Sequence, residues 1–214
     1  MLDDAENVDQ LDSRLRDGDE KALAELFTLH RERLRRMVEF RMDRRLQGRV
    51  DASDIVQEAY IDAAQRVRHY AKKPEMSFFV WLRQITTQRL IDVHRRHLDA
   101  KMRDARQEVS IHRGDLAATT SASIAAELIG QFASPSQLVM RAELLDRLEG
   151  ALEGMDPIDR EVLALRHFEE LTNNEVAQVL DITKSAASNR YVRALGRLKS
   201  VLERVPGFSD EESE

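Results

Sequence analysis

MDPIDREVLALRHFEELTNNEVAQVLDITKSAASNRYVRALGRLKSVL, residues 155–202, is the stretch of this chain with the clearest helix starts and stops. Asp156 stands before a proline, which predicts an N-cap followed by the first helical position. Thr172 is followed three residues later by a glutamate, which is the spacing of a capping box. Residues 181–183 then form a short turn whose threonine can cap a further helix. A helix, a three-residue turn and a second helix together predict a helix-turn-helix.

The helix after that turn is expected to have an apolar back and a polar, basic front. On a wheel of 3.6 residues per turn, the apolar stripe consists of Ala187, Tyr191, Ala194, Leu195, Leu198 and Leu202. The other side and its rims carry the candidate DNA-binding residues Lys184, Ser185, Asn189, Arg190, Arg193 and Arg197. Arginine and asparagine pair with base edges in the major groove, and cations hold phosphates. The alternative is a solvated face on a small helical bundle, because charged faces are common.

The composition limits the classes of protein to which the chain can belong. It has 214 residues, of which 42% are hydrophobic and 34% charged, and this suits one or two small soluble domains. Four prolines, eight glycines and few β-branched runs favour an all-α fold. No apolar run approaches the roughly 18 residues of a membrane span, and the acidic N-terminus does not resemble a signal peptide, so we expect no membrane contact. The absence of cysteine excludes disulfides and thiol catalysis and fits a cytoplasmic protein.

The net charge of −6 is a property of the two ends of the chain. Residues 1–20 hold eight acidic and two basic side chains and residues 210–214 add four acids, so residues 21–209 carry a net charge of +4. The overall acidity therefore does not argue against nucleic-acid binding by the central part. A positive charge this modest also suggests that DNA affinity depends on a partner.

Two amphipathic helices are predicted in the first half of the chain, over residues 19–47 and 51–69. The outward side of the second helix carries two acids, an amide and an isoleucine: Asp54, Gln57, Glu58 and Ile61. An exposed isoleucine among acids and amides resembles a protein-docking patch. The alternative is a single exposed apolar residue of the kind found on any protein surface.

The longest helical segment is predicted over residues 78–104. Its outer side carries a tryptophan, two glutamines and an arginine at helical spacing: Trp81, Gln84, Gln88 and Arg95. An aromatic face, amides and cations are what single-stranded DNA needs, and each stacked base contributes about 1–3 kcal/mol. The alternative is that the tryptophan belongs to a half-buried core and the glutamines are simply solvated. The predicted inner side consists of Phe78, Phe79, Leu82, Ile85, Val93 and His97.

Two further features of this segment require an interpretation. Arg89 falls on the inner side of the wheel, which requires either an acidic partner on a neighbouring helix or curvature of this helix. His94 and His97 stand three residues apart without a third ligand nearby, so we expect no metal site and assign them to the basic surface.

Composition and patterning divide the chain into five parts. Residues 1–18 are predicted to be an acidic mobile N-terminus, 19–104 a helical domain, 105–134 a flexible linker of small and polar residues, 135–205 a second helical domain, and 206–214 an acidic tail. The second domain begins with an amphipathic helix over residues 137–152 and contains the helix-turn-helix.

Three blocks of the chain, in this order, resemble the extracytoplasmic-function (ECF) group of bacterial RNA polymerase sigma factors. DASDIVQEAYIDAAQRV, residues 51–67, is similar to the polymerase-docking helix of the family. SFFVWLRQITTQRLIDVHRR, residues 77–96, is similar to its helix for promoter melting and −10 recognition, and residues 155–198 to its module that reads the −35 element. The match covers about residues 15–203. The ending SNRYVRALGRL, residues 188–198, resembles a subset common in planctomycetes.

The resemblance implies an all-α protein of two small helical domains joined by a flexible linker, with the helix-turn-helix in the C-terminal one. It implies core RNA polymerase, through its β′ clamp helices and β subunit, and promoter DNA as partners, and an anti-sigma factor as a candidate further partner. By resemblance, Asp54, Gln57 and Glu58 meet the clamp helices. Trp81 and Gln88 stand where the family captures a flipped −10 base, beside the loop 70–76.

The sequence departs from the pattern of the family at several positions. Gln88 stands where the family usually has asparagine, and Asp181 replaces the turn glycine. Ala186 and Ala187 occupy positions where bulkier residues are frequent. Aspartate tolerates the left-handed conformation that such a turn needs, so the turn is expected to survive. The promoter sequence is what these changes leave open.

The expected function is that of a sigma factor that binds core RNA polymerase and directs promoter recognition, DNA melting and transcription initiation at a specific regulon. No catalytic residue and no cofactor are expected, because the polymerase supplies the chemistry. The alternative is a stand-alone helix-turn-helix regulator that binds duplex DNA tightly without polymerase. An enzyme would have to use Glu58, Asp62 or His94, and these form no nucleophile–base pair or metal set in the sequence.

Overall fold

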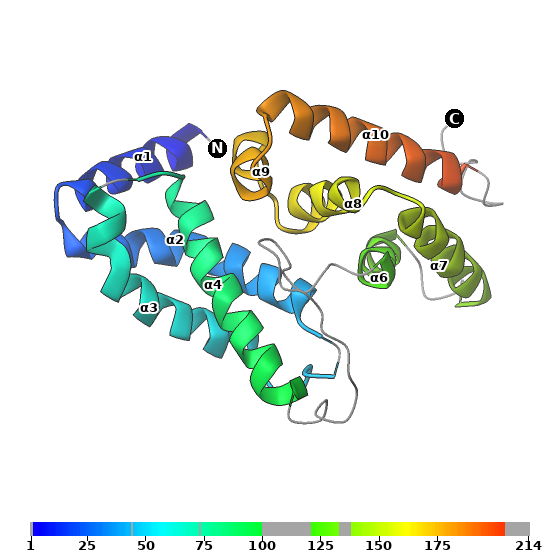
Figure 1. Ribbon diagram of the computed structural model, residues 1–214, viewed down its shortest axis with the longest axis horizontal. Helices are drawn as coiled ribbons and strands as arrows, with labels where there is room; N and C mark the ends of the chain where they lie inside the picture. The colour runs from blue at the N-terminus through cyan, green and yellow to red at the C-terminus, as the bar shows by residue number, and fades with distance from the viewer. Residues whose placement is uncertain (1, 44, 73, 100–120, 133–137, 204–214) are drawn as a thin grey trace. The chain divides into compact units, whose positions relative to one another are not determined.

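The structure is a computed structural model in which residues 2–43, 45–72, 74–99, 121–132 and 138–203 are described (Figure 1). Within these ranges every regular element is a helix, and the one β-bridge is an isolated pair, Gln47 with Val50. The predicted all-α fold is therefore confirmed. The chain divides into two compact units, residues 1–117 (unit 1) and residues 118–214 (unit 2).

Unit 1 is a bundle of helices around a hydrophobic core of aliphatic and aromatic side chains. Its elements are α1 (Leu2–Arg16), α2 (Glu20–Arg41), α3 (Ala52–Lys72), α4 (Phe78–His94) and a π-helical turn, η1 (Arg95–Asp99), that continues α4. Helix α2 packs against α1, α3 and α4, and α3 packs along α4, as Figure 1 shows. The side chains of Asp19 and Ser77 cap the starts of α2 and α4. The most deeply buried side chains include Leu26, Leu34, Met37, Leu82 and Leu90.

The N-terminal segment corrects one prediction, because residues 2–16 form α1 where a mobile end was expected. Leu11 and Leu15, spaced by one helical turn, are each only 3% exposed, and α1 packs on α2. Arg14 adds an ion pair to Asp19 at 2.7 Å and another to Glu25 at 3.0 Å. Two leucines at i and i+4 are a weak signal in an acidic stretch, and their burial against α2 is what makes this helix part of the bundle.

The other boundaries in unit 1 differ from the predicted ones in two places. Helix α2 ends at Arg41, well before residue 47, because Asp43 accepts hydrogen bonds from the Arg45 backbone N–H at 2.8 Å and from its guanidinium at 2.6 Å. Such a local side-chain turn competes with helix continuation. His97 is exposed in η1 and does not join the core, so its assignment to the inner side was wrong; the π-helical turn shifts the register there. Residues 100–104 of the predicted helix lie outside the described residues.

Unit 2 contains the predicted C-terminal helices and one more. Its elements are α6 (Ser121–Phe132), α7 (Leu138–Glu153), α8 (Pro157–Leu163), the π-helical η3 (Ala164–Phe168), α9 (Asn173–Leu180) and α10 (Lys184–Leu202). Helix α10 packs against α7, α8 and α9, so it is the central helix of this unit. Leu148, Leu152, Val162, Leu165 and Ala194 are among its buried core residues.

Helix α6 corrects the predicted linker of residues 105–134, because residues 121–132 are helical and pack against α7. Ile124 and Ala125 are fully buried and Ile129 is 3% exposed. These residues form an apolar stripe at helical spacing, which outweighs the small and polar composition on which the linker prediction relied. Residues 105–120 of the predicted linker, and residues 206–214 of the predicted tail, lie outside the described residues.

The predicted helix caps of residues 155–202 are confirmed. Asp156 accepts from the Ile158 N–H at the start of α8, and Thr172 and Glu175 form a complete capping box on α9. Thr183 caps α10 by accepting from the Ala186 N–H at 3.1 Å. Asp181, between α9 and α10, adopts the left-handed conformation with φ 53° and ψ 46°, as its replacement of the turn glycine required.

Candidate functional site

Four of the predicted site residues share one exposed face of α3. Asp54, Gln57, Glu58 and Ile61 follow one another at spacings of three, one and three residues, and all four are exposed. Ile61 is 52% exposed, whereas the opposite face of the helix is buried through Ile55, Val56 and Ala59. The structure therefore brings these four residues together, and we refer to them as the α3 patch. Its role in docking stays a prediction.

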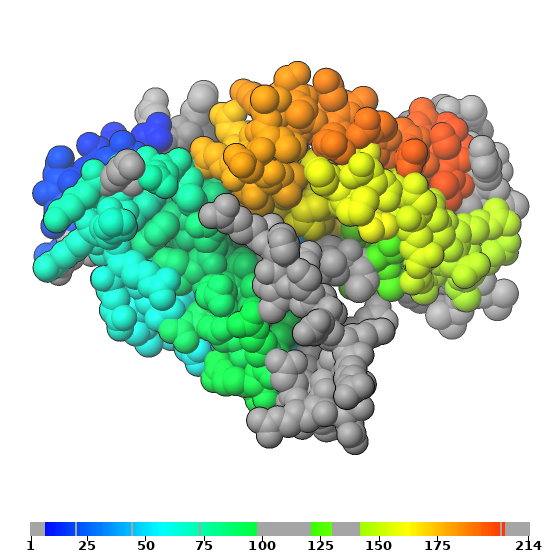
Figure 2. Space-filling model, in the orientation of Figure 1, coloured from blue at the N-terminus to red at the C-terminus, as the bar shows by residue number. Residues whose placement is uncertain are grey.

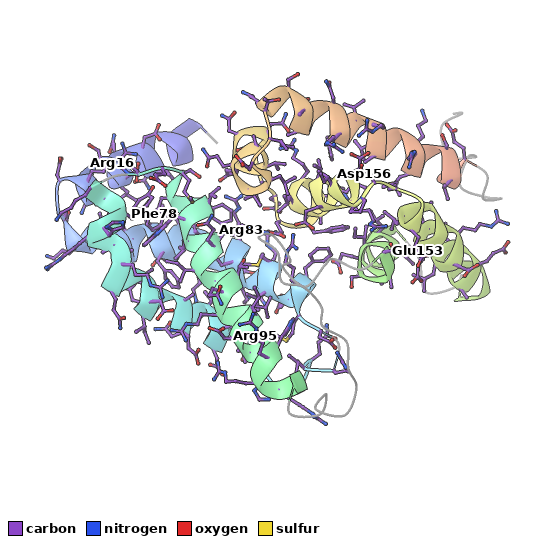
Figure 3. All side chains as sticks on the ribbon, in the orientation of Figure 1. Arg16, Phe78, Arg83, Arg95, Glu153 and Asp156 are labelled. Atoms are coloured by element: carbon purple, nitrogen blue, oxygen red, sulfur yellow. The ribbon has the colours of Figure 1, made fainter. Side chains whose placement is uncertain are left out.

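The outer side of α4 presents the predicted polar stripe. Gln84, Gln88 and Arg95 are exposed and Trp81 is half-buried. Figure 3 shows Phe78 and Arg95 at opposite ends of this long helical segment. The Gln88 Nε2 donates to the Asp92 Oδ1 at 3.2 Å, which leaves its Oε1 available as an acceptor. These four residues therefore lie along the outer side of α4 and of the π-helical turn that continues it.

Trp81 lies in an aromatic cluster that the sequence only partly indicated. Its ring stacks on Tyr70, with 4.6 Å between centroids and 23° between planes, and Phe78 lies 5.6 Å away at a tilt. The Tyr70 hydroxyl donates to the Met76 backbone carbonyl at 3.1 Å, so it ties the end of α3 to the loop before α4. Burial raises the pKa of Tyr70 well above its usual value. The indole is thus half-buried with Tyr70 stacked against it, as the core alternative predicts; its role in stacking a DNA base stays a prediction.

The inward position of Arg89 is explained by an acidic partner on α3, one of the two explanations the sequence allowed. The Arg89 guanidinium donates twice to the Asp62 carboxylate, with Nε and Nη2 each at 2.5 Å. This pairing holds the pKa of Asp62 below its usual value. Glu58 of the α3 patch lies 3.9 Å from both Arg89 and Arg96, so acids of α3 and cations of α4 face each other. The pair joins the patch-bearing helix to the stripe-bearing helix.

The predicted DNA-binding residues of α10 fall into two sets. Lys184, Ser185 and Asn189 are exposed and lie in its first half. The three arginines reach instead toward α8 and the residues before it: Arg190, Arg193 and Arg197. Figure 2 shows α10, in orange to red, at the surface along its length. Leu195, assigned to the buried stripe, is 38% exposed, and Val192, three residues before it, is 66% exposed. The buried face of α10 is therefore narrower than the predicted stripe.

Asp159 of α8 is the residue to which two of those arginines bind. It is 2% exposed, and it accepts from Arg193 Nε and Nη2 at 2.8 Å each and from Arg190 Nη1 at 2.7 Å. The Arg193 guanidinium, followed by that of Arg190, holds the pKa of this carboxyl below its usual value. Arg197 donates to the Gly154 carbonyl at 2.9 Å. Nothing in the sequence pattern indicated this partnership, because Asp159 and Arg193 are 34 residues apart.

His94, one of the two histidines spaced three residues apart, has a structural partner. Its Nε2 accepts from the Asp43 backbone N–H at 3.3 Å, and burial lowers its pKa. In the part of the chain that the structure describes, no three histidine, aspartate or glutamate side chains gather as a metal site. Among the helices of the same residues, none combines the length and hydropathy needed to cross a membrane.

Comparisons with known proteins identify the family of the chain. Residues 5–202 match the family described as ECF sigma factor. The ECF RNA polymerase sigma factor SigW of Bacillus subtilis (strain 168) is 23% identical over 190 residues, covering 88% of this chain and 93% of SigW. The RNA polymerase sigma-D factor of the same organism is 34% identical over 71 residues, covering 33% of this chain and 28% of that protein. Among solved structures, CnrH in complex with the cytosolic domain of CnrY is 19% identical with a TM-score of 0.48, covering 90% of this chain and 95% of CnrH.

The family match extends over nearly the whole chain, from α1 to the end of α10. It includes both units and therefore the α3 patch, the α4 stripe and the helix-turn-helix. The chain belongs to the ECF sigma factors, the proteins that direct transcription initiation by RNA polymerase.

Proposed function

We propose that this sigma factor docks on core RNA polymerase through the α3 patch and contacts promoter DNA through α4 and α10. The observation that carries the proposal is Ile61, which is 52% exposed on the same face of α3 as the exposed Asp54, Gln57 and Glu58. Burying a large apolar side chain is favourable by roughly 1.5–3 kcal/mol, so one held in solvent among polar groups suits a docking surface. We assign the clamp helices of the β′ subunit to this patch and the β subunit to a further contact.

The α4 stripe is the proposed −10 surface. Trp81 has one ring face against Tyr70, so a base that leaves the duplex would stack on the other. Gln84 and Gln88 offer amide groups to its Watson–Crick edge, and Arg95 a cation to the backbone. Stacking of about 1–3 kcal/mol per base offsets part of the cost of unstacking a base step, which is a few kcal/mol. The stripe therefore stabilises melted DNA without any chemistry of its own.

Helix α10 is the proposed −35 surface. Lys184, Ser185 and Asn189 are exposed in its first half, the part that enters the major groove in helix-turn-helix proteins. Arg190, Arg193 and Arg197 stand along the next two turns and complete a basic edge. The serine, the asparagine and arginine suit base edges, and the lysine and the other rim cations suit phosphates.

The two surfaces lie in separate units of one chain, and this is central to the proposed mechanism. Once polymerase holds unit 1 on a promoter, unit 2 searches the upstream duplex at high effective concentration. The factor needs no cofactor, since polymerase catalyses the reaction, and it works in the cytoplasm, where polymerase acts. An anti-sigma factor is the proposed inhibitor, and membership of the planctomycete-type subset remains part of the proposal.

Transcription in vitro on a library of random promoter sequences tests the proposal. Core polymerase with this chain should start at new sites that share two sequence elements, and core polymerase alone should not. Ile61→Glu should abolish those starts, whereas Leu29→Glu, at an apolar residue of α2 that is 44% exposed, should leave them intact. No gain of start sites with the wild-type chain would refute the proposal. Tight footprints on duplex DNA without polymerase would favour the stand-alone regulator instead.

A further inference from the structure

In unit 2, the carboxylate of Asp159 is buried and one edge of the Arg193 guanidinium is exposed, so the two side chains suit different roles. We propose that Asp159 is a positioning residue that holds one edge of the Arg193 guanidinium, so that the other edge meets a promoter base in a fixed orientation. This inference rests on the proposed role of α10 as the −35-reading helix. It adds a residue of α8, outside the reading helix, to those that determine promoter selectivity.

The geometry of the Arg193 contact leaves half of the guanidinium available. Asp159 binds the Nε and Nη2 atoms, each at 2.8 Å, which is the side-on pairing of a guanidinium with a carboxylate. The end-on edge, formed by Nη1 and the second hydrogen of Nη2, makes no hydrogen bond within the described residues. The Arg193 side chain is 55% exposed while Asp159 is 2% exposed, so the anchor is buried and the free edge reaches solvent.

Arg190 and Arg197 show that the anchoring is built into the packing of α10 on α8. Arg190 donates to the same Asp159 oxygen at 2.7 Å, and Arg197 donates to the Gly154 carbonyl at 2.9 Å. Figure 3 shows Asp156, the N-cap residue just before α8, beneath α10. The three arginines lie at spacings of three and four residues and therefore line one edge of the helix. Their contacts fix the rotation of α10 about its own axis.

A preordered arginine contributes selectivity more than affinity. A free arginine side chain loses rotamer freedom when it binds, and an anchored one has already lost it. The end-on edge matches the O6 and N7 acceptors of guanine, the commonest specific contact in the major groove. At the same time, the buried negative charge of Asp159 offsets part of the attraction between this helix edge and phosphates of any sequence. The expected consequence is a lower affinity for random DNA and a sharper preference at one base pair.

The test uses the full chain with core polymerase on the random promoter library. Asp159→Asn should reduce the preference at one position of the upstream element about tenfold, and Arg193→Ala should reduce it at the same position. The double variant should behave as Arg193→Ala alone, because each change removes the same contact, that of Arg193 with the base. Asp156→Asn is the matched control: it keeps the N-cap of α8 and removes a carboxylate 3.6 Å from Arg190, and it should leave the preference unchanged. The downstream element should not change in any variant.

The outcomes separate this inference from the proposed function. If the wild-type chain produces no start sites, the sigma mechanism itself fails. If it does and Asp159→Asn keeps the full upstream preference, the positioning role is refuted. Should Asp159→Asn fail to fold, NMR of the wild-type chain with the selected upstream duplex decides the question. The Arg193 Nε–H signal should keep its slow exchange when DNA binds, and its loss would refute the proposal.

Discussion

Replacing Arg89 with methionine tests the contact that joins α3 to α4. Arg89 donates to Asp62 through two nitrogens at 2.5 Å, and among the residues that the structure describes the one other cation paired with Asp62 is Arg66, at 3.9 Å. Methionine keeps the length of the aliphatic stem, so the change removes the charge and the hydrogen bonds with little loss of packing. The Asp62 carboxylate then stays in a largely buried place without its main partner.

The expected loss of stability follows from the exposure of the two side chains. Removing one partner of a fully buried ion pair costs about 3–5 kcal/mol. Here the Asp62 side chain is 12% exposed and the Arg89 side chain 31%, so water compensates for part of that cost. We expect a loss of about 2 kcal/mol, which corresponds to a fall of roughly 10 °C in the melting temperature of a unit of this size.

Trp81 provides an assay confined to unit 1, because it is the only tryptophan in the chain. Its indole stacks on Tyr70, so its fluorescence should change when α3 and α4 separate. Urea titration of the full chain, followed at this fluorescence, measures the free energy of unfolding of unit 1. Arg66→Met is the control, since the Arg66 side chain is 59% exposed and its ion pair to Asp62 is long, at 3.9 Å; the change should cost less than about 0.5 kcal/mol.

The pH dependence of this difference gives a second, independent check. Arg89 lowers the pKa of Asp62 in the folded state, below the 3.8 of an unperturbed aspartate. The stabilisation is therefore complete above pH 3.8 and is lost as the pH falls through the lower folded-state pKa. Wild type and Arg89→Met should differ at pH 6 and converge in acid. A difference that persists below that range, or no difference at pH 6, would show that the pair does not stabilise unit 1.

Three further changes test the α3 patch, the packing of α1 and the left-handed turn at Asp181. Ile61→Glu should weaken binding to core polymerase at least tenfold in an anisotropy titration while the Trp81 unfolding curve stays unchanged; unchanged binding would contradict the docking role. Leu15→Ala should destabilise unit 1 by about 2–4 kcal/mol in the urea assay, and a loss under 0.5 kcal/mol would mean that α1 does not belong to the core. Asp181→Ala should cost about 1 kcal/mol by circular dichroism and Asp181→Gly almost nothing, because only alanine is strained at φ 53°; equal curves would contradict the left-handed turn.

The sequence predicted well the interactions between residues that are close together in the chain. Asp156, Thr172 and Thr183 were identified as caps because a capping side chain binds a backbone group two or three residues away, and that distance is visible in the sequence. The face of α3 that carries Ile61 was equally visible, since helical periodicity alone separates it from the buried face. Predictions of this kind need no knowledge of what the helix packs against.

Helices α1 and α6 were missed because their evidence is tertiary. Each has a short apolar stripe in a stretch whose composition suggests disorder, with Leu11 and Leu15 in α1 and Ile124 and Ile129 in α6. Isolated helices of this length are marginal, so their formation depends on burial against α2 and α7. Composition reports the average polarity of a segment. Whether the segment packs on a neighbouring helix depends instead on two or three apolar side chains at helical spacing.

The same limit applies to charged residues and affects how the DNA surface should be interpreted. A helical wheel shows that Arg89 lies on an unexpected side, and this signals a partner, which proved to be Asp62, 27 residues earlier. The wheel gives no such signal for Arg193, because an arginine on the basic side of a helix is expected in that position without a partner in the protein. Its partner, Asp159, is 34 residues away and buried. A cation on an exposed face can therefore bind DNA only through the N–H groups that its own protein has not already bound. For Arg193, these N–H groups form one edge of the guanidinium.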